Sequence, residues 1–416
     1  MDLREESMQL HLKYNGKIET HGKVPLENDH DLAVAYTPGV AAPCLAIKEE
    51  ADRSFDLTCR GNMVAICTDG TRVLGLGKIG ARAAMPVMEG KAALFKRFGA
   101  VDAVPVCIDE TDKDKFVVIV KALQGNYAGI NLEDIQSPKC YDIEDELKKE
   151  LEIPVFHDDQ HGTAIACVSA VMGALRLVKK DIRTAKIVLN GAGAAGTAIG
   201  RLLVDAGAEN LIVMLHHGAL YEGCDNNGRP LDRVQEALSK VTNKERRKGR
   251  LADIVKGADV LLGVSAPGSF TQDMIRSMAK DPVVFAMANP VPEISYAEAK
   301  AAGARVAGTG RSDTPNQVNN VNVFPGVFRG AIDVRAREIN EAMKVAAVHA
   351  IAELIPENEL REDYVVPNAF DKRVAPAVAA AVAKAAMGTG VAREQRDPEE
   401  IRRSTYLRVN GVPMEE

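Results

Sequence analysis

Residues 186–215 read KIVLNGAGAAGTAIGRLLVDAGAENLIVML, and their pattern indicates the fold of the second half of the chain. An apolar run is followed by a glycine-rich turn, a helical stretch of small residues and a second apolar run. This order predicts a strand, a helix and a parallel strand, with the helix N-terminus facing a pyrophosphate group. The alternative is a purely structural glycine turn. We therefore predict dinucleotide binding at Gly191, Gly193, Ala194, Ala195 and Gly196.

Further apolar runs follow at 260–263, 283–287 and 305–307, separated by helical patterns. Runs that are apolar almost throughout are typical of parallel strands covered by helices on both faces. The second half is therefore predicted to be a Rossmann-like, doubly wound parallel sheet in an α/β protein.

The first half has a different pattern of apolar runs and breaks. It mixes helical stretches and glycine or proline breaks with strand-like runs at 63–67, 116–120, 128–132 and 154–156. This pattern predicts a separate N-terminal α/β domain. We expect three regions, namely this domain over 1–160, a nucleotide-binding domain over 161–390 and a charged, partly mobile tail over 391–416.

The composition is that of an ordinary globular protein. The chain has 416 residues, 46% of them apolar and 26% charged, which excludes intrinsic disorder. A formal net charge of −6 argues against nucleic acid as a partner. The N-terminus lacks the apolar core of a secretory signal, and no run of about 18 uncharged apolar residues is evident. We therefore expect a cytoplasmic protein with no membrane partner.

The sequence leaves open which dinucleotide binds. In NAD sites an acidic residue at the end of the second strand usually holds the ribose hydroxyls. Here that strand ends in Leu215-His216-His217-Gly218, without a carboxylate. A histidine can approach a 2′-phosphate, and a basic run follows at 244–250, although such runs are more often solvated loops. Both NAD and NADP therefore stay candidate cofactors.

A second match to the glycine pattern occurs at Gly75, Gly77 and Gly80. It follows a predicted turn, and Pro86 interrupts the helix downstream. We interpret it as a loop whose glycines permit close packing or the approach of a substrate, not as a second nucleotide site.

Polar groups gather at three places in the first half. Tyr36 precedes Thr-Pro-Gly, and Lys91 follows Pro-Val-Met-Glu-Gly. The third place holds two acidic pairs, 133–134 and 158–159, whose oxygen ligands suit Mg²⁺ or Mn²⁺. Adjacent strand residues point to opposite faces, so the pair 133–134 can share an ion only at a strand end or bend. From spacing alone, exposed carboxylates, a surface lysine and a core tyrosine are open alternatives.

Two further patterns bear on the chemistry of these places. Burial and a nearby divalent cation would both lower the pKa of Lys91 and make it a base. His157 and His161 have the spacing of zinc ligands on a helix, but the glutamate of that motif is replaced by Asp158. A zinc hydrolase is therefore not supported.

Nine short motifs occur in one order along the chain. They are AYTPGVA, GLGKIG, PVMEGK, GINLEDI, FHDDQHGTA, NGAGAAG, GVSAPG, MANPVPE and TGRSDTPNQVNNVNVFPG. In that order they closely resemble the malic enzymes, in their short prokaryotic form, over about residues 15–390. The resemblance implies oxidative decarboxylation of malate to pyruvate and CO₂ with reduction of NAD or NADP, dependent on Mg²⁺ or Mn²⁺, in a homodimer.

The resemblance also implies roles for individual residues. By matching motifs, the metal ligands are Glu133, Asp134 and Asp159. Lys91 would take the C2 hydroxyl proton of malate as the base, and Tyr36 would protonate C3 as the acid. The metal ion would act as the Lewis acid.

Four more residues receive roles in the same way. Asp158 would orient the lysine, and Arg72 would grip a malate carboxylate. Asn289 and Asn320 would contact the substrate and the nicotinamide end of the cofactor. The motif segment at LHHG departs from the aspartate common in the family, which keeps the nucleotide preference open.

Other functions stay open beside this one. A malolactic-type enzyme would use the same groups and release lactate. A non-catalytic nucleotide-sensing protein could have the same fold, although it would be free to lose Tyr36, Lys91 and the three carboxylates. A metal-dependent hydrolase or lyase is disfavoured by the dinucleotide turn.

Overall fold

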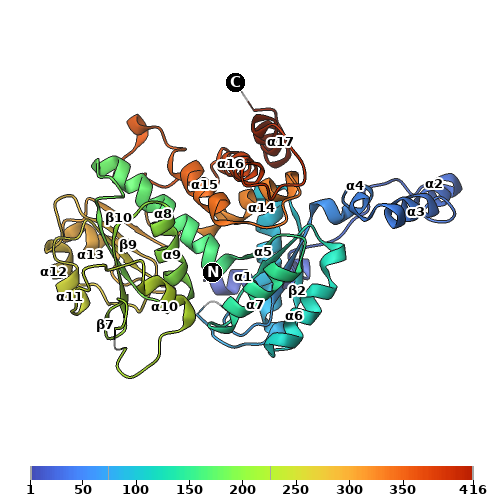
Figure 1. Cartoon of the computed structure of the whole chain (residues 1–416). Helices are drawn as coiled ribbons and strands as arrows, with labels where there is room; N and C mark the ends of the chain where they lie inside the picture. Colours follow the sequence, from blue (N-terminus) through green and yellow to red (C-terminus); the bar gives the residue numbers. More distant parts are fainter. Residues whose placement is uncertain (1, 74, 225, 415–416) are drawn as a thin grey trace.

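The glycine-rich stretch lies in a six-stranded sheet of order β10-β9-β8-β5-β6-β7. The computed structural model describes residues 2–73, 75–224 and 226–414 (Figure 1). The strands are β5 (Lys186–Asn190), β6 (Asn210–Leu215), β7 (Gly218–Ala219), β8 (Val260–Gly263), β9 (Val283–Ala286) and β10 (Val306–Thr309). All pair in parallel except the short edge strand β7. The predicted doubly wound sheet is confirmed, with one antiparallel addition.

Successive side chains along each strand point to opposite faces, so this sheet has a hydrophobic core on each face. Ile187 and Leu189 of β5 belong to a large core, and Val188 faces a smaller one. The large core includes α8 (Asp158–Val178) and α9 (Ala194–Asp205), and the smaller one includes α11 (Leu251–Ile254), α12 (Gln272–Arg276) and α13 (Tyr296–Ala301). The strand order reverses at β5, and ligands of such sheets bind at the carboxyl ends of the strands there.

The first half builds a smaller sheet of four parallel strands in the order β2-β1-β3-β4. Its strands are β1 (Met63–Thr68), β2 (Asp102–Cys107), β3 (Gly129–Leu132) and β4 (Val155–His157). The helices between them are α5 (Ala81–Gly99), α6 (Lys113–Ala122) and α7 (Lys139–Glu150). Parallel pairing puts the carboxyl ends of β1, β3 and β4 at one edge, where the predicted functional residues follow.

One predicted strand is wrong, because residues 116–120 lie within α6. Phe116, Val117 and Val120 are buried, and their spacing places them on one face of a helix. Asp112 caps this helix by accepting a hydrogen bond from the amide of Lys115 at 3.0 Å. A short apolar run does not by itself distinguish a strand from a buried helix segment.

Helix α8 connects the two sheets, since it begins directly after β4 and ends before β5. Its length and mean hydropathy would allow it to cross a membrane, although it also carries the charged residues Asp158, Asp159 and Arg176. However, 67% of its apolar window is buried inside the fold, as in the core helix of a soluble protein. Four further elements are spread along the chain, namely α1 (Leu3–Tyr14), η3 (Gln124–Asn126), α10 (Arg233–Ser239) and η5 (Glu357–Glu359).

The C-terminal helices return to the first half (Figure 1). They are α14 (Phe324–Asp333), α15 (Glu341–Ala352), α16 (Val374–Gly388) and α17 (Pro398–Asn410). α14 and α17 both contact α5. Helix α17 stands where the sequence predicts a partly mobile tail. Asp397 caps it, Pro398 opens it, and Ile401 and Thr405 are buried.

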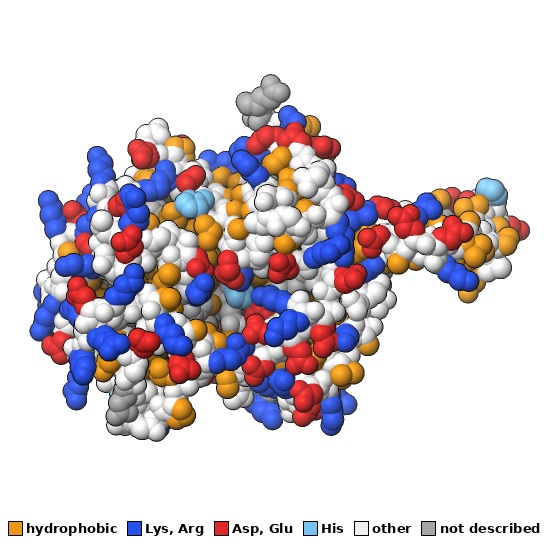
Figure 2. All heavy atoms as spheres, viewed as in Figure 1, with side chains coloured by type: hydrophobic (Ala, Val, Ile, Leu, Met, Phe, Trp, Pro, Cys, Tyr) orange, Lys and Arg blue, Asp and Glu red, His pale blue; other side chains and the backbone are white. Residues whose placement is uncertain are grey.

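An arm projects from the first half, away from the body of the molecule (Figure 1). It carries α2 (Asp29–Ala35) and α3 (Ala41–Glu49), and η1 (Ala51–Arg53), α4 (Ser54–Leu57) and η2 (Cys59–Asn62) lead back to the sheet. No residue of α2 or α3 is buried. The apolar side chains of Leu26, Leu32, Val34 and Leu45 are more than half exposed, and Figure 2 shows hydrophobic atoms over the end of the arm. The arm therefore has no core of its own.

Candidate functional site

Acidic residues follow two neighbouring strands at the carboxyl edge of the smaller sheet. Glu133 and Asp134 come directly after β3, and Asp158 and Asp159 follow β4 as the first residues of α8. Asp134 has a left-handed backbone with a φ of 54°, which bends the chain at the strand end. Its amide donates a hydrogen bond to Asp159 Oδ2 at 2.8 Å. The two acidic pairs are therefore brought together, at the bend that sharing an ion would require.

Lys91 reaches this edge from α5. Its Nζ lies 3.0 Å from Glu133 Oε1, is ion-paired with Asp158 and stands 4.1 Å from the centroid of the Phe324 ring. Burial opposes the charge of the amine, but Asp158 and Glu133 outweigh burial and raise the pKa of Lys91 above its ordinary value. With 10% of its side chain exposed, Lys91 is a buried ammonium group and not a surface lysine.

Asp158 is fully buried beside this lysine. Its Oδ2 accepts hydrogen bonds from Lys91 and, at 2.9 Å, from Asn320 Nδ2 in η4 (Asn320–Asn322). Within the part of the chain that the structure describes, Oδ1 has no hydrogen-bond partner. A Cβ on Gly162 would lie 1.8 Å from this atom, so only glycine leaves room for it. Asp158 thus binds Lys91 and Asn320 through Oδ2, and its buried Oδ1 can still accept a hydrogen bond.

The acidic cluster carries more negative charge than Lys91 neutralises. Burial, with repulsion from the three neighbouring aspartates, raises the pKa of Glu133 well above its usual value although Lys91 opposes the shift. Across residues 2–73, 75–224 and 226–414, no three His, Cys, Asp or Glu side chains converge closely enough to hold an ion in this conformation. The donors at 133, 134 and 159 are nevertheless all carboxylate oxygens, which suit Mg²⁺ or Mn²⁺, and a dication would offset the surplus charge.

The other two predicted substrate residues, Arg72 and Asn289, lie on the loops that follow β1 and β9. The backbone amide of Arg72 donates to the Asp134 carbonyl at 3.0 Å, and the Arg72 side chain is exposed. Asn289 follows β9 and is also exposed. A Cβ on Gly75 would lie 3.6 Å from Pro290 Cδ, so the loop after β1 packs against the loop after β9. The glycines at 75–80 thus belong to a loop that approaches the nucleotide domain.

Sequence reasoning missed three residues of this site. Asn131, a buried polar residue within β3, donates to Glu133 Oε2 at 2.9 Å, and its position inside an apolar strand is a signal that could have been used. Gly162 could have been found from its place four residues after Asp158 on one helix. Phe324 gives no local signal, because its contact with Lys91 joins distant parts of the chain.

His157 and His161, which have the spacing of zinc ligands on a helix, lie on different elements. His157 lies in β4 and is fully buried, whereas His161 lies on α8. The two histidines therefore do not share a helix face, in agreement with the rejection of a zinc hydrolase. His161 Nε2 instead lies 2.8 Å from Glu144 Oε1.

The glycine turn after β5 has the geometry that close approach of a ligand requires. Gly191 has a φ of 119°, and a Cβ there would lie 2.6 Å from the Val264 carbonyl oxygen. A Cβ on Gly196 would lie 2.0 Å from the Gly191 oxygen, so both positions need glycine. Gly193 has open space around it and precedes α9, whose first residues are Ala194 and Ala195. No side chain caps this helix, which leaves its first amides available to an anion.

A cavity of about 810 Å³ adjoins the turn and extends along the carboxyl ends of β5 and β6. His216 and His217 line it at the end of β6, and Arg250 lines it from the basic run at 244–250. None of the lining residues is acidic. The cavity thus offers positive or neutral groups where a ribose-binding carboxylate would otherwise stand.

Tyr36 is the predicted residue that one chain does not bring to the site. It ends α2, which lies on the projecting arm (Figure 1), and 68% of its surface is exposed. It is therefore not a core tyrosine. The predicted acid and base, Tyr36 and Lys91, lie on separate parts of one chain.

Two family models match the sequence. The model described as the N-terminal domain of malic enzyme matches residues 15–114, and the one described as its NAD binding domain matches residues 160–387. The second match spans the six-stranded sheet and the glycine turn, and the first spans β1 and β2 of the smaller sheet.

Known relatives agree with this match. A bifunctional malic/malolactic enzyme of Bacillus subtilis is 56% identical over 97% of this chain and 98% of its own length. An NAD-dependent malic enzyme of Geobacillus stearothermophilus is 49% identical over 96% of this chain and 82% of its own. A crystal structure of a Pyrococcus horikoshii malic enzyme has a TM-score of 0.92 at 45% identity, covering 98% of this chain and 96% of that one. The chain therefore belongs to the malic enzyme family.

Proposed function

We propose that the protein catalyses the divalent-metal-dependent oxidative decarboxylation of malate to pyruvate and CO₂, with reduction of NAD or NADP. The observation that carries the proposal is the buried Lys91, held between Glu133 and Asp158 where the loops of both halves meet. Residues up to 160 would bind substrate and metal, and residues 161–390 would bind the nucleotide. A small-molecule substrate and a nucleotide cofactor fit the cytoplasmic location expected from the sequence.

The carboxylates of Glu133, Asp134 and Asp159 would hold Mg²⁺ or Mn²⁺. When bound, the ion would supply Lewis-acid polarisation of the substrate, and the nicotinamide would accept hydride. Asn320 and Asn289 would orient the substrate and the nicotinamide, and Arg72 would bind a malate carboxylate.

Lys91 Nζ is proposed to take the proton of the C2 hydroxyl. The lysine must be neutral at that moment, although the neighbouring carboxylates now raise its pKa. Neutralising those carboxylates with a dication would remove part of the charge that keeps the amine protonated. Asp158 would fix the position of Nζ through its ion pair.

Tyr36 is proposed to protonate C3 in the site of a second copy of the chain. The arm exposes this tyrosine together with Leu32 and Val34, and no core of its own covers them. The Lys91 site of the same chain has no tyrosine among its described contacts. A homodimer in which arms are exchanged would bury the apolar side chains and complete both sites at once.

The Bacillus subtilis relative is named both a malic and a malolactic enzyme, which keeps release of lactate as a second candidate activity. We expect malate, Mn²⁺ and either NAD or NADP to give reduced nucleotide and pyruvate in equal amounts. EDTA should abolish the reaction and added Mn²⁺ should restore it. Lactate without accumulation of reduced nucleotide would establish the malolactic activity instead, and turnover that resists EDTA would contradict the metal assignment.

Replacing the proposed base tests its role directly. Lys91→Ala should lower kcat for malate oxidation by about 10² to 10⁴ and leave nucleotide affinity unchanged, since proton transfer contributes about that factor. Lys96→Ala on the same helix, whose side chain is 63% exposed, is the matched control. Tyr36→Phe should block protonation of enolpyruvate while sparing hydride transfer more than Lys91→Ala does. Near-full turnover of Lys91→Ala would refute the assignment.

We further propose that the cavity at His216, His217 and Arg250 accepts the 2′-phosphate of NADP. Arg250→Ala should raise the KM for NADP by about 10- to 150-fold and change the KM for NAD little, because a guanidinium–phosphate contact contributes about 1.5–3 kcal/mol. Arg246→Ala in the same basic run is the control, because Arg246 does not line the cavity and pairs with Glu222. Equal effects of Arg250→Ala on both nucleotides would contradict this proposal.

A further inference from the structure

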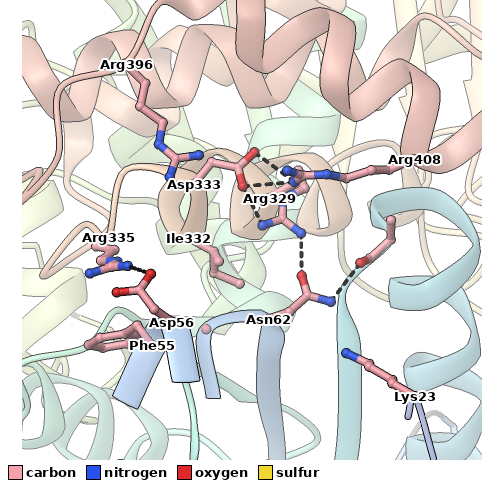
Figure 3. A pocket seen from close by; sticks show the side chains of 12 residues that line it. Lys23, Phe55, Asp56, Asn62, Arg329, Ile332, Asp333, Arg335, Arg396 and Arg408 are labelled. Atoms are coloured by element: carbon pink, nitrogen blue, oxygen red, sulfur yellow. Dashed lines mark hydrogen bonds and ion pairs between the residues drawn. The ribbon is translucent and has the colours of Figure 1, made fainter. Parts of the chain in front are cut away.

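A second cavity has a volume of about 490 Å³ (Figure 3). It is bounded by the end of α14, by α17 and by the segment of residues 55–62 at the base of the arm. None of the residues assigned above to substrate, metal or nucleotide lines it. Five cationic side chains do, namely Lys23, Arg329, Arg335, Arg396 and Arg408.

Arg329 forms the buried wall of this cavity, with 3% of its surface exposed. Its Nη1 donates to Asn62 Oδ1 at 2.6 Å, and its Nη2 donates to Asp333 Oδ1 at 2.6 Å. Its Nε is buried and has no hydrogen-bond partner among the residues that the structure describes. A buried donor left unsatisfied is costly, so this guanidinium has capacity for one more acceptor.

The carboxylates around the cavity do not balance its arginines. Asp333 is shared, because Arg408 Nη1 also donates to it at 3.0 Å. Glu394 is shared in the same way by Arg335 and Arg396, each at 2.9 Å. Arg335 also pairs with Asp56. The four arginine side chains thus form their ion pairs with only three carboxylates, those of Asp56, Asp333 and Glu394.

The surplus positive charge affects the pKa of the buried Arg329. Burial lowers the pKa of Arg329, the attraction of Asp333 opposes this shift, and repulsion from Arg408 and Arg396 adds to it. Lys23 adds a further cation at the rim, where its nearest acidic partner, Asp102, is 3.8 Å away and also binds Lys96. A network built only to join α14 to α17 would not need this excess.

We propose that the cavity binds a small polyanion that carries phosphate or carboxylate groups. Guanidinium groups bind both kinds of oxyanion in a planar, bidentate manner, and the volume is within the range of small-ligand sites. One oxyanion group would accept from Arg329 Nε and from Arg408, and Arg396 and Lys23 would bind the outer part of the ligand.

This cavity is linked to the catalytic region by one helix. Arg329 and Asp333 lie in the second half of α14, and Phe324, whose ring contacts Lys91, is its first residue. The proposal concerns binding and does not rest on the proposed reaction.

The test uses titration calorimetry of the full-length protein with two probes, inorganic pyrophosphate and citrate, without metal and with NADP present to fill the nucleotide turn. We expect at least one probe to bind to each chain with a dissociation constant in the micromolar range. Arg408→Gln and Arg396→Gln should each weaken binding at least tenfold. Arg403→Gln, an exposed arginine of the same helix α17 outside the cavity, should bind as the wild type does.

The outcomes distinguish a phosphate ligand from a polycarboxylate ligand. Binding of pyrophosphate alone would identify a phosphate ligand, and binding of citrate alone would identify a polycarboxylate. Binding that Arg408→Gln and Arg396→Gln leave unchanged, or no binding of either probe at millimolar concentration, would overturn the proposal. Two variants are used because Arg408 also contacts Asp333, whereas Arg396 contacts the more exposed Glu394.

Discussion

The structure depends on a buried ammonium group that must be surrounded by carboxylates. An unpaired charge inside a protein is strongly unfavourable, so Lys91 on α5 requires Glu133 after β3 and Asp158 at the start of α8. These contacts fix α5, the end of β3 and the start of α8 relative to one another. They also explain why Gly162 stands where it does, since a Cβ at this position would collide with Asp158 Oδ1.

The same cluster connects the two halves of the molecule. Asp158 opens the helix that continues into the core of the larger sheet, and Asn320, in η4 after the last strand of that sheet, donates a hydrogen bond to Asp158. Phe324 follows Asn320 closely and covers the lysine. A hydrogen bond therefore joins residues from both halves of the chain at the acidic cluster.

Much of this could be predicted because the signals are local. The βαβ unit follows from a glycine turn between apolar runs, and the acidic pairs follow from their places at strand ends. What could not be predicted depends on contacts distant in sequence or on competing local signals. The run at 116–120 reads equally as a strand or a helix face, and the charged residues near the C-terminus mask the Asp-Pro start of α17. The placement of Tyr36 on an exposed arm has no sequence signal that we recognised.

In the proposed mechanism, Lys91 of one chain acts with Tyr36 of another. Co-expressing Lys91→Ala and Tyr36→Phe chains with different tags, and purifying the mixed dimer through both tags, tests this pairing. If Tyr36 acts on the partner, one of the two sites in this dimer has both residues intact, and the malate-dependent rate should be about half that of the wild type. If both residues act within one chain, neither site is intact. A mixed dimer no more active than the single-variant dimers would contradict the account.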